Sequence, residues 1–177
     1  VVRADGTRVG FHYDGHRSRW RGGGAVVEDG VRAIDVTRTA SDELVTLGVD
    51  GAVALDRAPG PGPAFTVPGA INVASAPDGA WLAFGLRDRV EVRDRDGGRR
   101  WTAPTATAVL AVAISADGRW LATGGSDGTV AIWAAATGAL AATVRGHRGR
   151  IEGLVFAGAD GLWSVGWDGT AQRSDLA

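Results

Sequence analysis

Residues 109–156 read VLAVAISADGRWLATGGSDGTVAIWAAATGALAATVRGHRGRIEGLVF, and this stretch contains the clearest indication of the architecture. Short apolar segments alternate in it with the turn pairs Asp117-Gly118 and Asp127-Gly128. Asp-Gly pairs favour hairpin turns, because glycine tolerates a positive φ and the aspartate side chain bonds nearby backbone N–H groups. Apolar residues at every second position of 109–115 indicate a strand with one buried face, and the nearly continuous apolar run at 120–125 indicates a strand buried on both faces. The stretch therefore predicts an antiparallel meander.

The same arrangement recurs along the whole chain. One series of acidic turns has spacings of 45, 38, 39 and 41 residues: Asp5-Gly6, Asp50-Gly51, Asp88-Arg89, Asp127-Gly128 and Asp168-Gly169. A second series precedes the last four by eight to ten residues: Asp42-Glu43, Asp78-Gly79, Asp117-Gly118 and Asp160-Gly161. A period of about 40 residues indicates a repeat architecture in which each unit packs on its neighbours. We expect an all-β protein built from four-stranded antiparallel meanders.

Composition excludes several other classes of protein. The chain has 177 residues with 19 Lys plus Arg and 20 Asp plus Glu, and a formal charge of -1 does not favour a nucleic-acid partner. The 28 glycines imply many tight turns. Without cysteine there is no disulfide framework or thiolate metal site, and no apolar run or leader directs the chain to a membrane, so we expect a cytoplasmic protein. Arginine-rich, lysine-free usage is typical of a high-GC bacterial genome.

On these residues the chain resembles the WD-repeat (WD40) family of β-propellers. The resemblance rests on Gly146-His147, the turn Asp127-Gly128 and the strand-ending Trp133, and it is strong over 105–177, moderate over 69–104 and weak over 1–68. It implies four-stranded blades arranged in a ring around a central channel. We expect about four to five blades here. Their predicted bounds are 1–29 for the end of a preceding blade, then 30–68, 69–107 and 108–148, and 149–177 for a last blade without its outer strand.

These repeats predict an incomplete ring. An open blade face with about 500 Å² of apolar surface forgoes about 12 kcal/mol at ~25 cal/mol per Å², which is comparable to the net stability of a domain. We therefore expect the chain to be the C-terminal part of a longer propeller, with the remaining blades on an upstream segment or another chain. Ring completion by self-association and a compact propeller of four or five blades are the alternatives.

The resemblance also implies a hydrogen-bonded network in each blade, made by a His before the first strand, a Ser or Thr in the second, the turn Asp and a Trp in the third. The six residues at such positions are Thr123, Asp127 and Trp133 in one repeat and His147, Ser164 and Asp168 in the next. Neither repeat is complete, because Thr105 stands at the His position of the first and Ser174 at the Trp position of the second. We interpret these six residues as structural.

The family resemblance implies a non-enzymatic scaffold for protein–protein interaction, or a regulatory or sensor propeller in a bacterial multidomain or multichain signalling protein. Its partners would contact the loops at one end of the ring, where Arg148, Arg150 and Trp167 are the predicted anchors. No cofactor site or metal-ligand spacing is recognisable in the sequence. His147, Ser164 and Asp168 are three residue types of a catalytic triad, but the strained elbow that exposes a catalytic serine is missing, so no catalytic residue is predicted.

Two other functions need different features. A ligand-binding or enzymatic propeller of the lactonase or quinoprotein type needs acids or histidines that converge on the channel from several blades, and no obvious ring of them is visible. Nucleic-acid binding through residues 16–24, HRSRWRGGG, would use three arginines interleaved with Trp20. An outer strand guarded by arginine explains the same pattern.

Overall fold

The computed structural model describes residues 8–11, 16–20, 26–39, 43–57, 60–61, 65–158 and 160–176, and all regular structure in these ranges is β. The strands are β1 (Arg8–Phe11), β2 (His16–Trp20), β3 (Val26–Arg38), β4 (Leu44–Gly48), β5 (Ala52–Arg57), β6 (Gly60–Pro61), β7 (Phe65–Thr66), β8 (Asn72–Ser75), β9 (Trp81–Gly85), β10 (Arg89–Asp94), β11 (Arg99–Pro104), β12 (Val109–Ile114), β13 (Trp120–Gly125), β14 (Thr129–Ala134), β15 (Ala139–Arg145), β16 (Ile151–Ala157), β17 (Gly161–Gly166) and β18 (Ala171–Asp175). Among the described residues there is no helix that could span a membrane.

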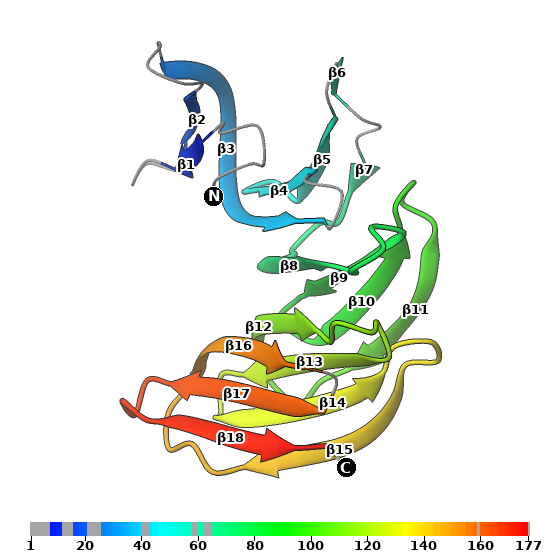
Figure 1. Ribbon diagram of the computed structural model, residues 1–177, viewed down its shortest axis with the longest axis vertical. Helices are drawn as coiled ribbons and strands as arrows, with labels where there is room; N and C mark the ends of the chain where they lie inside the picture. The colour runs from blue at the N-terminus through cyan, green and yellow to red at the C-terminus, as the bar shows by residue number, and fades with distance from the viewer. Residues whose placement is uncertain are drawn as a thin grey trace.

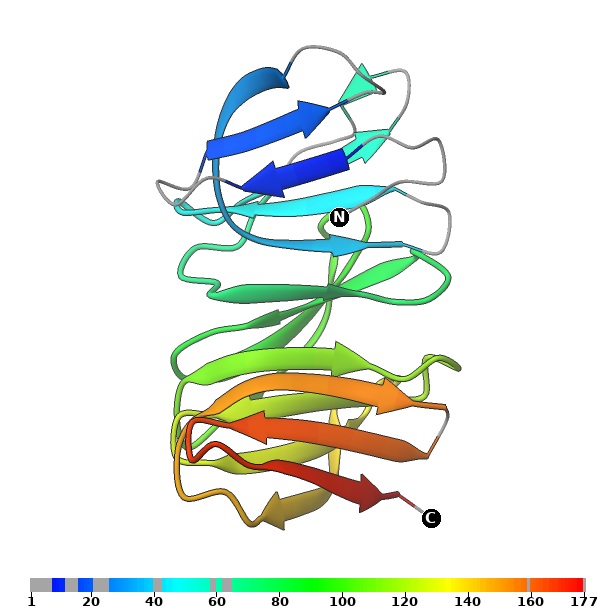
Figure 2. The same ribbon diagram turned by 60° about the vertical axis from the view of Figure 1, so that its left-hand side comes forward.

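The described strands form four antiparallel sheets: a first sheet of β1–β7, a second of β8–β11, a third of β12–β15 and a fourth of β16–β18. Figures 1 and 2 show them following one another along an arc, with strands β3, β8, β12 and β16 toward its inside. The predicted all-β propeller of meandering blades in an incomplete ring is confirmed.

Strand β3 bends sharply and joins two parts of the first sheet, as Figure 1 shows. Its first half pairs with β2 and its second half with β4. The strand therefore crosses the predicted boundary between residues 29 and 30. The other predicted boundaries, at 68/69, 107/108 and 148/149, fall in the segments that connect the sheets.

The acidic turns have the local chemistry expected from the sequence. The side chain of Asp127 accepts the N–H of Thr129 at 3.0 Å, and Asp50, Asp78, Asp117 and Asp168 each accept the N–H two residues on in the same way. Gly128 follows with a φ of 82°. A Cβ there would lie 2.7 Å from the carbonyl oxygen of His147, so the turn also needs glycine for its close approach to the next loop.

Apolar clusters lie between successive sheets and hold the arc together. Leu47 and Phe84 belong to the cluster between the first and second sheets, Trp81 and Leu121 to the next, and Ile132 and Leu162 to the last. These central positions are buried on both faces of their sheets, which accounts for the nearly continuous apolar runs in β4, β9 and β13.

Candidate functional site

Three of the predicted network residues meet in the fourth sheet. The His147 side chain is 2% exposed, with Nε2 2.9 Å from Ser164 Oγ and Nδ1 3.2 Å from both carboxylate oxygens of Asp168. Because a carboxylate can only accept, Nδ1 carries a proton and donates a hydrogen bond to Asp168. A side chain at Gly166 would collide with the imidazole ring.

Asp168 joins two loops at one end of the fourth sheet. Its Oδ2 accepts the backbone N–H of Arg148 at 2.7 Å, and its Oδ1 accepts the hydroxyl and the N–H of Thr170. The Arg148 N–H, followed by the two bonds from Thr170, holds the pKa of Asp168 well below its usual range. The N–H of Trp167 in turn donates to the carbonyl of Arg150 at 2.8 Å. Loop 146–150 and turn 167–170 are therefore fixed to each other, and we call them together the loop surface.

The predicted anchors all lie on this loop surface. The Arg150 guanidinium stacks 3.6 Å from the centre of the Trp167 ring and also pairs with Glu152. Trp167 is 67% exposed, and the side chain of Arg148 is also turned to solvent. The two arginines and the tryptophan thus form a cationic and aromatic patch on a rigid backbone.

The equivalent network of the third sheet is built differently. Trp133 Nε1 donates to Thr123 Oγ1 at 2.9 Å, so these two predicted residues meet. Asp127 bonds Thr129 and the hydroxyl of Thr107 at 3.3 Å. Sequence reasoning missed Thr107, because it considered Thr105 at the histidine position and not the hydroxyl two residues later.

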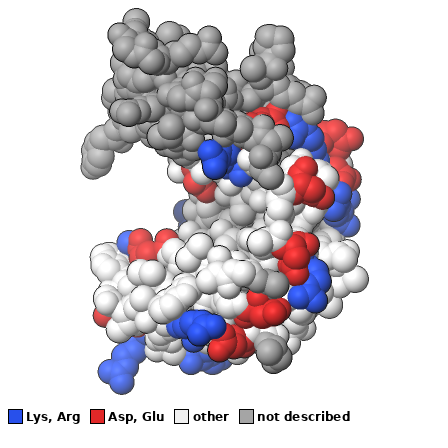
Figure 3. All heavy atoms as spheres, viewed as in Figure 1, with Lys and Arg blue, Asp and Glu red and all other residues white. Residues whose placement is uncertain are grey.

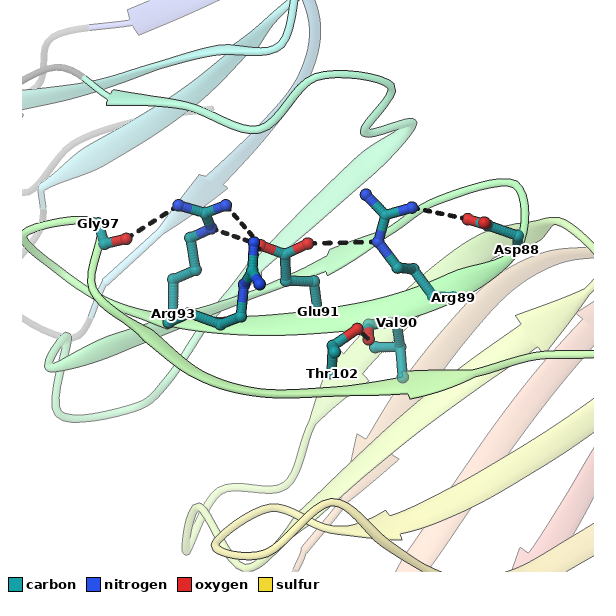
Figure 4. A network of polar contacts seen from close by, with 8 residues as sticks. Asp88, Arg89, Val90, Glu91, Arg93, Gly97 and Thr102 are labelled. Atoms are coloured by element: carbon teal, nitrogen blue, oxygen red, sulfur yellow. Dashed lines mark hydrogen bonds and ion pairs between the residues drawn. The ribbon is translucent and has the colours of Figure 1, made fainter.

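A buried ion cluster in the second sheet was also missed. Figure 4 shows Glu91 on β10 facing arginines from both sides. Its Oε1 accepts from Arg93 Nε at 2.7 Å and Arg99 Nε at 3.4 Å, and its Oε2 accepts from Arg89 Nε at 3.4 Å. Burial alone would raise the pKa of Glu91, but the Arg93 hydrogen bond and the charges of the arginines outweigh it and lower that pKa. The cluster links β10 to β11 through Arg99. The alternation of charged residues and valines in ArgValGluValArg, residues 89–93, is the sequence signal that could have predicted it.

Charge is otherwise mixed over the visible surface. Figure 3 shows acidic and basic side chains interspersed along the right-hand edge, near β10 and β11, and mostly uncharged side chains across the middle. The described residues on this face form no extended basic stripe for a phosphate backbone.

The inside of the arc contains a hollow of about 340 Å³ with Asp35, Asn72 and Glu152 as its polar residues. Asp35 accepts the N–H groups of Val36 at 2.7 Å and Val73 at 2.8 Å, and burial raises its pKa despite these bonds. The side-chain amide of Asn72 donates to a carbonyl in the neighbouring sheet, and Glu152 is paired with an arginine. Within the described residues, no three His, Cys, Asp or Glu side chains are grouped to hold a metal ion.

The described part of the 16–24 segment, residues 16–20, is not the outer strand that was expected. Strand β2 lies between β1 and β3, because β3 begins at Val26 and its first half covers the second edge of β2. Arg21 lies outside the described residues.

Two comparisons with known proteins agree with this geometry. Residues 99–134, from β11 to β14, match the family described as "WD domain, G-beta repeat". The chain is also 31% identical over 111 residues to the Periodic tryptophan protein 2 homolog of Dictyostelium discoideum. That alignment covers 55% of this chain and 11% of the relative, so the chain spans about a tenth of the relative's length.

Proposed function

We propose that this chain, a WD40-type β-propeller, is a non-enzymatic platform that binds a protein partner through the loop surface, with Arg148, Arg150 and Trp167 as its anchors. WD40 propellers generally act through protein–protein contacts. The observation that carries the proposal is the stacking of Arg150 on a tryptophan that is two-thirds exposed.

An exposed indole costs free energy in water unless a partner covers it. The backbone of Trp167 is fixed by the hydrogen bond from its N–H to the carbonyl of Arg150. The neighbouring loop is fixed by the hydrogen bond from the Arg148 N–H to Asp168. A preorganised anchor loses little conformational entropy on binding, and Trp and Arg are the residue types enriched among the residues that dominate interface energies.

The charges of the loop surface favour a partner with acidic side chains. Glu152 already pairs with Arg150, whereas the exposed Arg148 contributes its backbone N–H to Asp168 and keeps its guanidinium at the surface. A carboxylate of the partner could then make a bidentate pair with Arg148 while an apolar group covers Trp167.

The proposal extends to the setting of the platform. We place it in the cytoplasm of a bacterium, as a regulatory or sensor part of a multidomain or multichain signalling protein whose remaining blades complete the ring. What supports the additional blades is the uncovered face of the fourth sheet, where Val155, Trp163 and Val165 are exposed.

Quantitative capture tests the loop surface. The full chain is immobilised, exposed to a soluble extract of its own host, and compared with the double variant Arg148→Ala/Trp167→Ala. Recovery of the specific partner should fall about 10-fold or more, because truncating such anchors typically costs over about 1–2 kcal/mol. Arg100→Ala is the matched control, since Arg100 also lies over an indole, that of Trp81, but far from the loops. Equal recovery by the double variant and the wild type would refute the proposal.

A further inference from the structure

Successive sheets pack closely at one equivalent position on strands β4, β9, β13 and β17. This position lies three residues before the turn aspartate and is occupied by Leu47, Gly85, Gly124 and Val165. A Cβ added at Gly85 would lie 2.7 Å from Cγ1 of Val109, and one added at Gly124 would lie 2.6 Å from Cβ of Ile151. In these two interfaces a glycine therefore receives the large first residue of the next sheet.

In the interface between the first and second sheets, the large residue belongs to the earlier sheet and the small residue to the later one. Leu47 is fully buried in it, in the same apolar cluster as Ala70. Ala70 occupies the position equivalent to Val109. Asn72 pairs with Gly85 as Ala111 pairs with Gly124, so Asn72 and Ala111 are equivalent. Ala70 and Val109 each precede these residues by two positions. Every described interface thus combines one large and one small residue at this point, as close packing requires.

The fourth sheet presents the same face without a cover in the described chain. Val165 is 47% exposed, Trp163 is 41% exposed, and Val155, the cross-strand partner of Trp163, is 60% exposed. The position of Trp163, five residues before the turn aspartate, is occupied in the other sheets by Val45, Ala83 and Ala122, and all three are fully buried by the next sheet. The exposed face is therefore continuous with the internal interfaces of this chain.

We infer that this face seats a further β-sheet whose first strand presents a small side chain, Ala, Gly or Ser, against Val165. The inference rests on the proposed completion of the ring by additional blades and specifies their chemistry. Glycine at this position in the second and third sheets leaves room for Val109 and Ile151, whereas Val165 occupies that space in the fourth sheet. A following sheet with Val or Ile against Val165 would therefore be overpacked. The Leu47–Ala70 interface is the arrangement that this face repeats.

The chain itself supplies the probes for a test. A copy of residues 58–107 or of residues 95–148 is appended to the C-terminus. Each copy brings a closing strand and then a sheet with either Ala70, two residues before β8, or Val109, the first residue of β12, at the position that meets Val165. Because the protein has no cysteine, Val155→Cys reports coverage of the face through its rate of maleimide labelling. Val155 lies on β16, away from the open edge of β18, so its protection requires stacking of a sheet. Leu140→Cys, on β15 and 55% exposed, is the matched control.

The 58–107 extension should slow labelling at position 155 by about tenfold or more, as burial in a native interface does, and leave position 140 unchanged. The 95–148 extension should leave position 155 as reactive as in the chain alone, and Val109→Ala within the appended copy should restore protection. Equal protection by both extensions would overturn the size rule and keep the proposed additional blades. Protection by neither would overturn the seat for a further sheet as well, whereas the loop surface is tested separately by partner capture.

Discussion

His147 Nε2 lies 2.9 Å from Ser164 Oγ, and this pair joins the segment before β16 to the middle of β17. The same imidazole bonds Asp168 through Nδ1, so one buried ring connects the interior of the fourth sheet with the loops at its end. The position of the exposed Trp167 therefore depends on a hydrogen bond made inside the sheet.

Removal of the serine hydroxyl should destabilise the fourth sheet. Ser164→Ala leaves Nε2 of the buried His147 without its partner, and we expect the free energy of unfolding to fall by about 1–3 kcal/mol, the cost of an unsatisfied buried polar group. Urea unfolding followed by tryptophan fluorescence measures it. The half-buried Ser174 on β18, outside this network, is the control, and Ser174→Ala should change stability by less than about 0.5 kcal/mol. Equal effects of the two substitutions would show that the His147–Ser164 bond contributes nothing.

Asp168 should make stability sensitive to acid. Its pKa is lowered in the folded state by the Arg148 N–H and Thr170, so its stabilising contribution is present above its unfolded pKa, about 3.9, and is lost as the pH falls toward the folded value. Thermal unfolding of wild type and Asp168→Asn between pH 2 and 6 should give a difference in Tm that is constant above about pH 5 and shrinks below pH 4. A difference that grows with acidity would mean that the folded-state pKa is not lowered.

Asp35 should make the protein less stable as the pH rises, which is the opposite of the effect of Asp168. Burial raises its pKa in the folded state, so the proton bound there stabilises the protein below the unfolded pKa, and this contribution is lost as the pH rises through the folded value. Relative to Asp35→Asn, the wild type should therefore lose stability as the pH rises above the unfolded pKa of about 3.9. Urea unfolding at a series of pH values above that point measures the trend, and a flat difference would contradict it.

Close contact between the third and fourth sheets should not tolerate a methyl group. A Cβ at Gly124 would lie 2.6 Å from Cβ of Ile151, and we expect Gly124→Ala to cost about 1–3 kcal/mol by overpacking. Gly153 is the matched control, because a Cβ there meets no atom within 4 Å. Gly153→Ala on β16 should be neutral or slightly stabilising, since alanine restricts the unfolded chain. Chemical denaturation of both variants decides between packing and a general intolerance of alanine in these strands.

The repeat and its turns were predictable because they depend on local chemistry. In five described Asp-Gly turns, such as Asp127-Gly128, a positive φ and a side-chain bond specify the turn without information from distant residues. Asp160-Gly161 differs, because Gly158 has the positive φ there and Gly161 begins β17. The apolar period then determines which faces of the strands are buried.

What was not predictable depends on relations between repeats. The continuation of β3 across residues 29 and 30 follows from its pairing with β2, and the fold alone reveals this pairing. Thr107 bonds Asp127 from the segment before β12, and Arg99 reaches Glu91 from β11, so neither of these two pairs lies within a single turn or strand of the sequence. The alternation of large and small residues between sheets likewise appears once Leu47, Gly85, Gly124 and Val165 are seen at one position.

Hydrogen–deuterium exchange with the captured partner is the most direct test of the account. Bound partner should slow exchange in the peptides that cover 145–153 and 165–170, which contain the whole loop surface, and leave β10 and β11 unchanged. Protection confined to other parts of the molecule, with both loop peptides exchanging as in the free chain, would contradict the assignment of Arg148, Arg150 and Trp167 as the binding anchors.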